Sequence, residues 1–343
     1  MKAHWKRLLA VLFLGVIPGF GVIIKDAGNE SAYYGIPDAA NNIFNGIAGI
    51  NGNSCTGFAI SLNVVLTAAH CVSGGGTPQV TFWLPDANPG GVGTQTFTPT
   101  SVLVNPLFNS SNLVNGYDIA LLRFDDGILP DSIHTYPVYD FPITGPTEFE
   151  LFGRGRCGSP LTGSVVSEPN GACADGVDLH RATNRYDQLL GSNILLYDFT
   201  QSDTPTNHLT NPAVDCPATS ALCYVTHFAY GEKDSLGGKQ GIAVFGDSGG
   251  PSLINLNGVY YSVGLHSFIG CDTGMGLFAC VNPPDIDGSI GPNGTFGEYA
   301  GDTYLYALSH FIQTGENVPE PGTWALAIGG FLVLDQMRRK RIR

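Results

Sequence analysis

The sequence predicts an all-β protein whose short strands are separated by many turns. Three observations support this. The 343 residues include 46 glycines and 22 prolines, only 13% of residues are charged, and short β-branched or aromatic runs are bounded by Gly, Pro, Asn or Asp. The length is sufficient for a sizeable core, and β proteins of this size can form a single fold.

Strands can be recognised in the sequence from residue 55 onward. The expected strands are, in order, 64–66, 80–84, 119–124, 194–197 and 259–265. A helix is expected near the C-terminus, because apolar residues there recur at the spacing of one helical face, namely Tyr304, Ala307, Leu308, Phe311 and Ile312.

The N-terminal end has the layout of a secretory signal. Lys2, Lys6 and Arg7 precede an apolar run over 8–17, which is too short to span a membrane as a helix. We assign residues 1–25 to a signal peptide, with cleavage between about 19 and 28, and residues 26–50 to an N-terminal arm or propeptide. An uncleaved anchor is the alternative.

The C-terminal end, residues 318–343, combines Pro319-Glu320-Pro321, an apolar segment over 324–334 and a basic cluster over 338–341. It resembles the PEP-CTERM sorting tail of Gram-negative bacteria, which an exosortase recognises and cuts. The resemblance implies an exosortase-type partner, transient inner-membrane anchoring with the basic end cytoplasmic, and a secreted or cell-envelope protein. The segment is short for a membrane span, and a plain C-terminal anchor is the alternative.

The charge distribution argues against nucleic-acid binding. The formal net charge is −13, but the positive residues gather at the two ends. Residues 26–317 contain 7 Lys and Arg against 27 Asp and Glu, a net charge of −20. A body this acidic repels phosphate backbones.

The eight cysteines, all between residues 55 and 280, predict an oxidising compartment and four disulfides. A zinc site is the weaker alternative, because the sequence has no closely spaced Cys-x-x-Cys or paired-His pattern. We therefore expect no metal and no cofactor.

Three motifs carry chemistry: Thr67-Ala68-Ala69-His70-Cys71, Asp118-Ile119-Ala120-Leu121-Leu122 and Gly246-Asp247-Ser248-Gly249-Gly250-Pro251. A serine hydroxyl needs a base within hydrogen-bond reach and a group that orients the base. Histidine suits the first role and a buried aspartate the second. His70, Asp118 and Ser248 match these roles.

The motifs and their order resemble the chymotrypsin/trypsin-like serine protease family over about residues 55–314. The resemblance implies two six-stranded antiparallel β-barrels with a C-terminal helix over 51–317. It also implies a serine endopeptidase that cuts protein or peptide substrates through an acyl-enzyme. The 130 residues from Asp118 to Ser248 exceed the family spacing, so we expect surface insertions within 153–240.

The resemblance assigns further roles near the nucleophile. The backbone N–H groups of Gly246 and Ser248 would form the oxyanion hole. In the family Asp247 pairs with a newly freed N-terminus. No Ile-Val-Gly-Gly-like start stands at the expected distance before His70, so we expect an Arg or a polar network as its partner.

The family bridge beside the catalytic histidine corresponds to Cys55–Cys71. The family bridge beside the nucleophile lacks one partner, because Val244 stands where that cysteine would be. Proximity in the sequence suggests three further pairs: Cys157–Cys173, Cys216–Cys223 and Cys271–Cys280. The sequence leaves many other pairings open.

The specificity pocket is read from two stretches. Ile242 stands where the family has the pocket floor, which disfavours Arg or Lys because their charge would be buried without a partner. Ser267, Phe268 and Ile269 correspond to the pocket wall, and Ile269 replaces a glycine, which favours small or medium apolar side chains. His266 precedes the wall, where glutamate-specific relatives carry a carboxylate-binding histidine; a packed histidine is the alternative.

The main alternative function is a catalytically inactive binding or matrix protein of the envelope on the same fold. An esterase of the Gly-x-Ser-x-Gly type is disfavoured, because the serine would have to precede the histidine.

Overall fold

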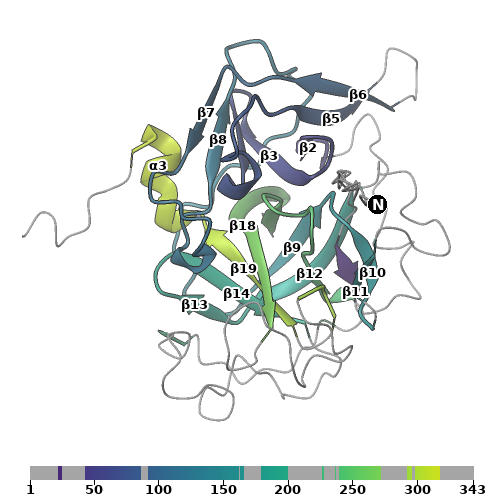
Figure 1. Cartoon of the computed structure of the whole chain (residues 1–343), viewed down its shortest axis with the longest axis vertical. Coiled ribbons are helices and arrows are strands. Elements are labelled where there is room, and N and C mark those ends of the chain that lie inside the picture. The colour runs from purple at the N-terminus through teal and green to yellow at the C-terminus, as the bar shows by residue number, and fades with distance from the viewer. Residues whose placement is uncertain are drawn as a thin grey trace, which may run out of the picture.

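The computed structural model describes residues 22–24, 43–85, 92–161, 163–165, 179–199, 226–227, 236, 239–271, 292–295 and 298–316. The described chain folds into two curled antiparallel sheets, which form the upper and lower lobes in Figure 1. This confirms the fold class, which is mostly β with two half-barrels of the chymotrypsin type and little helix.

The first sheet has the strand order β6-β5-β2-β3-β4-β8-β7. Its strands are β2 (Ile47–Ile50), β3 (Cys55–Ser61), β4 (Val64–Thr67), β5 (Val80–Pro85), β6 (Val92–Phe97), β7 (Ser101–Val104) and β8 (Ala120–Arg123). Two short 3-10 helices interrupt it, η1 (Ala69–Cys71) after β4 and η2 (Leu113–Asn115) before β8.

The second sheet has the order β12-β9-β17-β18-β19-β14-β13-β15. Its strands are β9 (Thr147–Gly153), β12 (His180–Tyr186), β13 (Gln188–Leu190), β14 (Ile194–Asp198), β15 (Thr226–His227), β17 (Pro251–Leu256), β18 (Val259–Cys271) and β19 (Glu298–Tyr304). Two small sheets adjoin it: β10 (Cys157–Ser159) with β11 (Gly163–Val165), and β1 (Ile23–Ile24) with β16 (Gly241–Ile242). The described sheets thus have seven and eight strands, where the resemblance implied six each.

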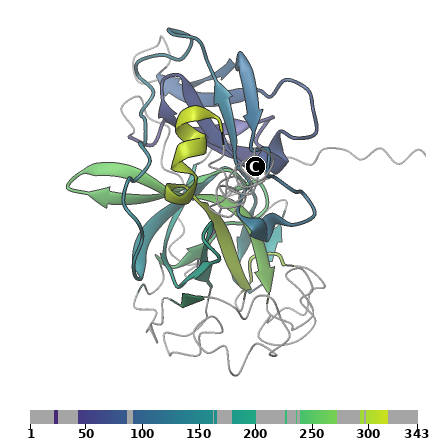
Figure 2. The same cartoon turned by 90° about the vertical axis from the view of Figure 1, so that its left-hand side faces the viewer.

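The apolar core has a part inside each sheet and a part between them. Phe58 and Leu66 of the first sheet belong to the same buried cluster as Phe152 and Leu265 of the second. The C-terminal helix α3 (Ser309–Thr314), which follows the 3-10 turn η5 (Tyr306–Leu308), contributes Phe311 to this shared cluster. Figure 2 shows α3 against both lobes, so the helix helps to fix one sheet relative to the other.

Each predicted strand corresponds to an observed one, although β18 is longer than predicted. The predicted helical face is only partly α-helical, because Tyr304 ends strand β19 and Ala307 and Leu308 lie in the 3-10 turn η5. Ala307 is also exposed. Strand β2 falls within residues 26–50, the stretch assigned to an arm or propeptide, yet it pairs with β3 and β5 inside the first sheet. Its four residues lack the alternating pattern of a half-buried strand because all four are buried.

No helix in the described part of the chain is long and apolar enough to cross a membrane. Of the predicted signal peptide, residues 1–25, the structure describes only 22–24, and the predicted sorting tail over 318–343 lies outside the described residues.

Candidate active site

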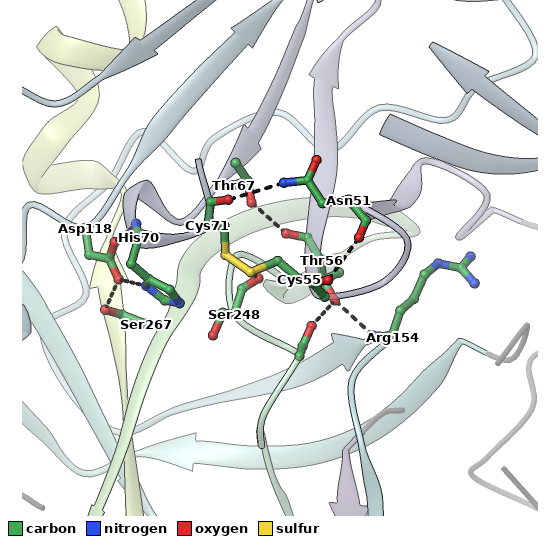
Figure 3. The surroundings of a disulfide bond; sticks show 12 residues. Asn51, Cys55, Thr56, Thr67, His70, Cys71, Asp118, Arg154, Ser248 and Ser267 are labelled. Carbon is green, nitrogen blue, oxygen red and sulfur yellow. Dashed lines mark hydrogen bonds and ion pairs between the residues drawn. A yellow bond between two sulfur atoms is a disulfide. The ribbon is translucent and has the colours of Figure 1, made fainter. Parts of the chain in front are cut away.

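His70 lies in η1, directly after strand β4, at the junction of the two lobes. The adjoining Cys71 forms a disulfide with Cys55 of β3, and 16 residues separate the two cysteines. Figure 3 shows this bridge between Ser248 and the turn that carries His70. The predicted Cys55–Cys71 pair is therefore present in the structure, and it holds the histidine turn against the neighbouring strand.

Asp118 precedes strand β8 and is completely buried. Its Oδ2 atom lies 2.7 Å from His70 Nδ1, and its Oδ1 atom accepts a hydrogen bond from the His70 backbone N–H at 2.9 Å. Ser267 donates its hydroxyl to Oδ2 at 2.6 Å. A carboxylate facing Nδ1 favours the tautomer in which Nδ1 carries the proton, so Nε2 of His70 remains available as a base.

Ser248 lies in the turn before β17, on the opposite lobe from His70. The turn contains two glycines with positive φ, Gly246 at 93° and Gly249 at 84°. A Cβ atom on Gly249 would lie 2.3 Å from the Thr56 carbonyl oxygen, so only glycine fits there. Thr56 also donates its N–H to the Ser248 carbonyl at 2.9 Å, which ties the serine turn to the first sheet.

His70 and Ser248 line the same pocket but form no hydrogen bond with each other in this structure. Such contacts between nucleophile and base are often long in unliganded enzymes. The backbone N–H groups of Gly246 and Ser248 donate to no described residue. The turn therefore offers two unused N–H donors, one on Ser248 itself and one two residues before it.

The pocket beside Ser248 has a volume of about 410 Å³ and mostly apolar walls. Besides His70 and Ser248 it is lined by Leu113, Tyr197, Ala243, Val244, Phe245, His266, Ser267, Phe268, Ile269, Pro292 and Asp302. Four of the five predicted substrate-binding residues thus lie on its wall. Ile242 is the exception.

Ile242 lies in the core, not among the residues that line the pocket. It is fully buried, pairs with Ile23 across the small β1-β16 sheet and belongs to a cluster with Ile24 and Val244. The next two residues, Ala243 and Val244, line the pocket instead. Counting six residues back from the serine placed Ile242 at the pocket floor, and the pairing with β1 explains why it lies elsewhere.

His266 forms a second histidine–carboxylate pair, which the sequence did not reveal. Its Nδ1 atom lies 2.8 Å from Oδ1 of Asp302, and the two residues face each other across strands β18 and β19. Tyr186 and Ser252 each donate a hydroxyl to Oδ2 of Asp302 at 2.6 Å. Burial and the neighbouring Asp302 carboxylate raise the pKa of Tyr186 well above its usual value, so Tyr186 remains a donor.

Asp247, beside the nucleophile, is also completely buried. Its Oδ2 atom accepts the backbone N–H groups of Val22 at 3.0 Å and Val244 at 2.8 Å, and Oδ1 accepts that of Gly155 at 2.8 Å. Burial raises the pKa of the Asp247 carboxyl to about 6, despite these hydrogen bonds and the nearby His266, which favour the charged form. Of the two expected partners, an arginine is not found among the described residues, whereas a polar network is present and consists of these three backbone N–H groups.

The other predicted disulfides cannot be compared with the structure. Cys173, Cys216, Cys223 and Cys280 lie outside the described residues, as do the side chains of Cys157 and Cys271. In the described part of the chain, Cys55, His70 and Cys71 form the sole group spaced for a metal ion. Its two sulfur atoms are bonded to each other, so they are not free to act as thiolate ligands.

Comparisons with known proteins agree with this geometry. The Trypsin family model matches residues 35–176, a segment that includes His70 and Asp118 and ends before Ser248. Chymotrypsin-like elastase family member 1 of Rattus norvegicus is 26% identical over 229 residues, covering 64% of this chain and 71% of the relative. The Felis catus protein of that name is 26% identical over 225 residues, again 64% and 71%. The Macaca fascicularis protein is 35% identical over 80 residues, 23% of this chain and 30% of the relative.

The family match, the relatives and the two-sheet fold together support a serine protease hydrolase with a trypsin-like domain.

Proposed function

We propose that this protein is a serine endopeptidase in which His70, Asp118 and Ser248 form the catalytic triad. The observation that supports it best is the 2.7 Å contact between Asp118 and His70 beside Ser248, at the mouth of an apolar pocket. His70 Nε2 would take the proton of the Ser248 hydroxyl as its oxygen attacks the substrate carbonyl. The acyl-enzyme would then be hydrolysed by water through the same base.

The negative charge of the tetrahedral intermediate needs donors that are already in place. The N–H groups of Gly246 and Ser248 are suited to this, because neither donates to another described residue. Asp118 would stabilise the imidazolium form of His70 while remaining ionised.

The pocket would accept small or medium apolar side chains. Its walls include Ala243, Val244, Phe268 and Ile269. Among the described residues that line it, a buried Arg or Lys side chain would find no carboxylate other than Asp302, which already accepts three hydrogen bonds. The protein is therefore proposed to cut after residues other than Arg and Lys. Whether His266 also binds a glutamate carboxylate is a separate question, treated in the Discussion.

A fluorophosphonate probe tests the assignment of the nucleophile. The unmodified protein should be labelled at Ser248, and Ser248→Ala should lose all labelling. Ser192→Ala, which removes an exposed serine in the turn between β13 and β14, is the matched control and should react normally. Full labelling of the Ser248→Ala protein would refute the triad. No labelling of the unmodified, correctly folded protein would favour the inactive binding or matrix protein.

We further propose that the protein is secreted or held in the cell envelope of a Gram-negative bacterium. The support is sequence-based: the N-terminal signal layout and the Pro319-Glu320-Pro321 tail with its basic end. An exosortase-type enzyme would remove the tail after transient anchoring in the inner membrane. Intact-mass analysis from the native host tests this, because a mature chain that still ends at Arg343 would contradict the sorting proposal.

A further inference from the structure

Thr56 contacts the nucleophile turn at both residues whose N–H groups are unused. Thr56 is completely buried and belongs to strand β3 of the first sheet, whereas the turn precedes β17 of the second. The Thr56 backbone N–H donates to the Ser248 carbonyl at 2.9 Å, and the Thr56 hydroxyl donates to the Gly246 carbonyl at 2.9 Å. A single residue of the first lobe thus holds Gly246 and Ser248, the two residues suited to bind an oxyanion.

The direction of the Thr56 hydroxyl is fixed by its two partners. The backbone N–H of Arg154 donates to the hydroxyl oxygen at 3.0 Å, and Figure 3 shows this bond as a dashed line. An N–H group only donates and a carbonyl only accepts, so the hydroxyl proton must point to the Gly246 carbonyl. Because threonine is branched at Cβ, its χ1 angle is also restricted. The hydroxyl is therefore held in place to bind the Gly246 carbonyl.

Arg154 is a rigid support for this hydroxyl. It directly follows strand β9 and is only 2% exposed. Its Nε atom donates to a backbone carbonyl of β2 at 3.0 Å, and its guanidinium lies 3.6 Å from the centre of the Trp83 ring. The next residue, Gly155, lies against the turn, because a Cβ atom on Gly246 would be 2.6 Å from the Gly155 Cα atom. The Arg154 N–H and the Gly246 carbonyl therefore reach Thr56 from two backbone segments that touch each other.

Gly246 needs external support because its backbone is free to rotate. Its φ is 93°, a conformation that suits glycine, but a residue without a Cβ also leaves it easily. The peptide plane before Gly246 is held by the Arg156 N–H, which donates to the Phe245 carbonyl at 2.7 Å. The plane after it is held within the turn by the Asp247 N–H and from outside by the Thr56 hydroxyl. Among the described residues, no other group donates to the Gly246 carbonyl.

We infer that Thr56 is a positioning residue for the oxyanion hole, whose hydroxyl keeps the Gly246 N–H in the direction needed to meet the oxyanion. This inference rests on the proposed protease function. Donors that are fixed before the reaction stabilise the developing charge without having to reorient. The charge exists in the transition state and not in the bound substrate, so losing the hydroxyl should affect catalysis more than substrate binding. The backbone bond from Thr56 to Ser248 does not need the side chain and should persist.

Thr56→Val tests the inference, because it replaces the hydroxyl with a methyl group of similar size. We expect kcat to fall by about 10- to 100-fold, less than after loss of a whole oxyanion donor, while KM stays nearly the same. The affinity for a peptide trifluoromethyl ketone, whose adduct with Ser248 carries an oxyanion, should fall by a similar factor. Thr56→Ser keeps the hydroxyl and should recover most of kcat.

Ser262→Ala is the matched control for the loss of a buried hydroxyl. Ser262 is fully buried on β18, and its hydroxyl donates to the Tyr136 carbonyl at 3.1 Å, not to the nucleophile turn. Both variants should lower the thermal midpoint by about 2 °C or more, because each leaves a carbonyl without its donor. Only Thr56→Val should lower kcat. If Thr56→Val does not fold, Thr56→Ala removes the same hydroxyl without adding a methyl group and should give the same fall in kcat.

The possible outcomes separate this inference from the proposed function. If the unmodified protein reacts with the fluorophosphonate and Thr56→Val keeps its kcat, the inference is wrong and the protease proposal stands. Equal falls in kcat for Thr56→Val and Ser262→Ala would also overturn it, because a general loss of stability would explain both. A change confined to KM would contradict a role in the transition state. If the unmodified, folded protein does not react with the probe, the protease proposal fails and the positioning role fails with it.

Discussion

The structure contains two histidine–aspartate pairs that share a geometry and differ in their surroundings. His70 Nδ1 lies 2.7 Å from Asp118 and His266 Nδ1 lies 2.8 Å from Asp302, and both carboxylates are buried. The His70 side chain is 29% exposed, whereas that of His266 is only 3% exposed. Both histidines line the pocket that contains Ser248, but Nε2 of His266 is buried and has no hydrogen-bond partner among the described residues.

This difference shows that a short histidine–carboxylate contact does not by itself identify a base. A base must reach both the nucleophile and the substrate, so the exposure of the imidazole decides between the two pairs. His266 and Asp302 are built differently as well, because they face each other directly in the register of β18 and β19. His70 lies in a 3-10 turn and Asp118 lies two residues before strand β8, and the disulfide and Ser267 support this pair.

Replacing each histidine in turn should produce the largest contrast. His70→Ala should lower kcat by about 10⁶-fold, as removal of the base does in other triads. His266→Ala should change kcat on an apolar substrate by less than about tenfold, because a buried imidazole cannot take the serine proton. The measurement is steady-state kinetics on one peptide, with Ser248→Ala as reference and the His70→Ala/Ser248→Ala double variant expected to be little worse than either. If His266→Ala lowered kcat as much as His70→Ala, the distinction between the two pairs would be wrong.

The two aspartates should differ in the same direction by a smaller amount. Asp118→Asn removes the charge that selects the His70 tautomer and should lower kcat by about 10⁴-fold. Asp302→Asn likewise replaces a carboxylate with an amide in the buried pair, and it should lower kcat on the apolar substrate by less than about 10²-fold. Equal losses in the two variants, with both proteins folded by circular dichroism, would contradict the distinction.

The sequence predicts those parts of this site that lie within a short segment, and it does not predict those that depend on residues far apart in the sequence. The triad motifs, the Cys55–Cys71 bridge and most of the pocket wall lie in short segments with definite chemistry, and each was located by residue. Asp302 was not predicted, because its role comes from strand register and no motif surrounds it. Val22 was missed for a similar reason: its partner Asp247 is 225 residues away, and the apolar residues 22–24 resemble the end of a signal peptide. Ile242 was misplaced because a fixed offset from the serine ignores pairing with β1.

Substrate preference tests what the buried pair contributes to the pocket. A peptide library should be cut after Ala, Val or Leu. The kcat/KM for these residues should exceed that for Arg or Lys by about 10³-fold or more, because a buried cation without a partner costs several kcal/mol. Dominant cleavage after Arg or Lys would overturn this view of the pocket. Glutamate is measured separately. Loss of glutamate cleavage alone in His266→Ala would make His266 a carboxylate-binding residue, and unchanged preferences would make it a packing residue.

Removing the disulfide should disturb the exposed pair and leave the buried one unchanged, with the smallest effect of the four. The Cys55–Cys71 bridge closes a loop of 16 residues, so the variant Cys55→Ser/Cys71→Ser should lose about 3 kcal/mol of unfolding free energy in a denaturant titration. The His70 turn is anchored by Cys71, so fluorophosphonate labelling at Ser248 should slow in the folded variant. His266 and Asp302 are held by strand pairing instead, so the ratio of cleavage after apolar residues to cleavage after Arg should remain unchanged.

The control is Ser54→Ala/Ser73→Ala, which alters two exposed positions near the cysteines and keeps the bridge. A changed ratio with unchanged labelling would show that the disulfide supports the buried pair and not the triad.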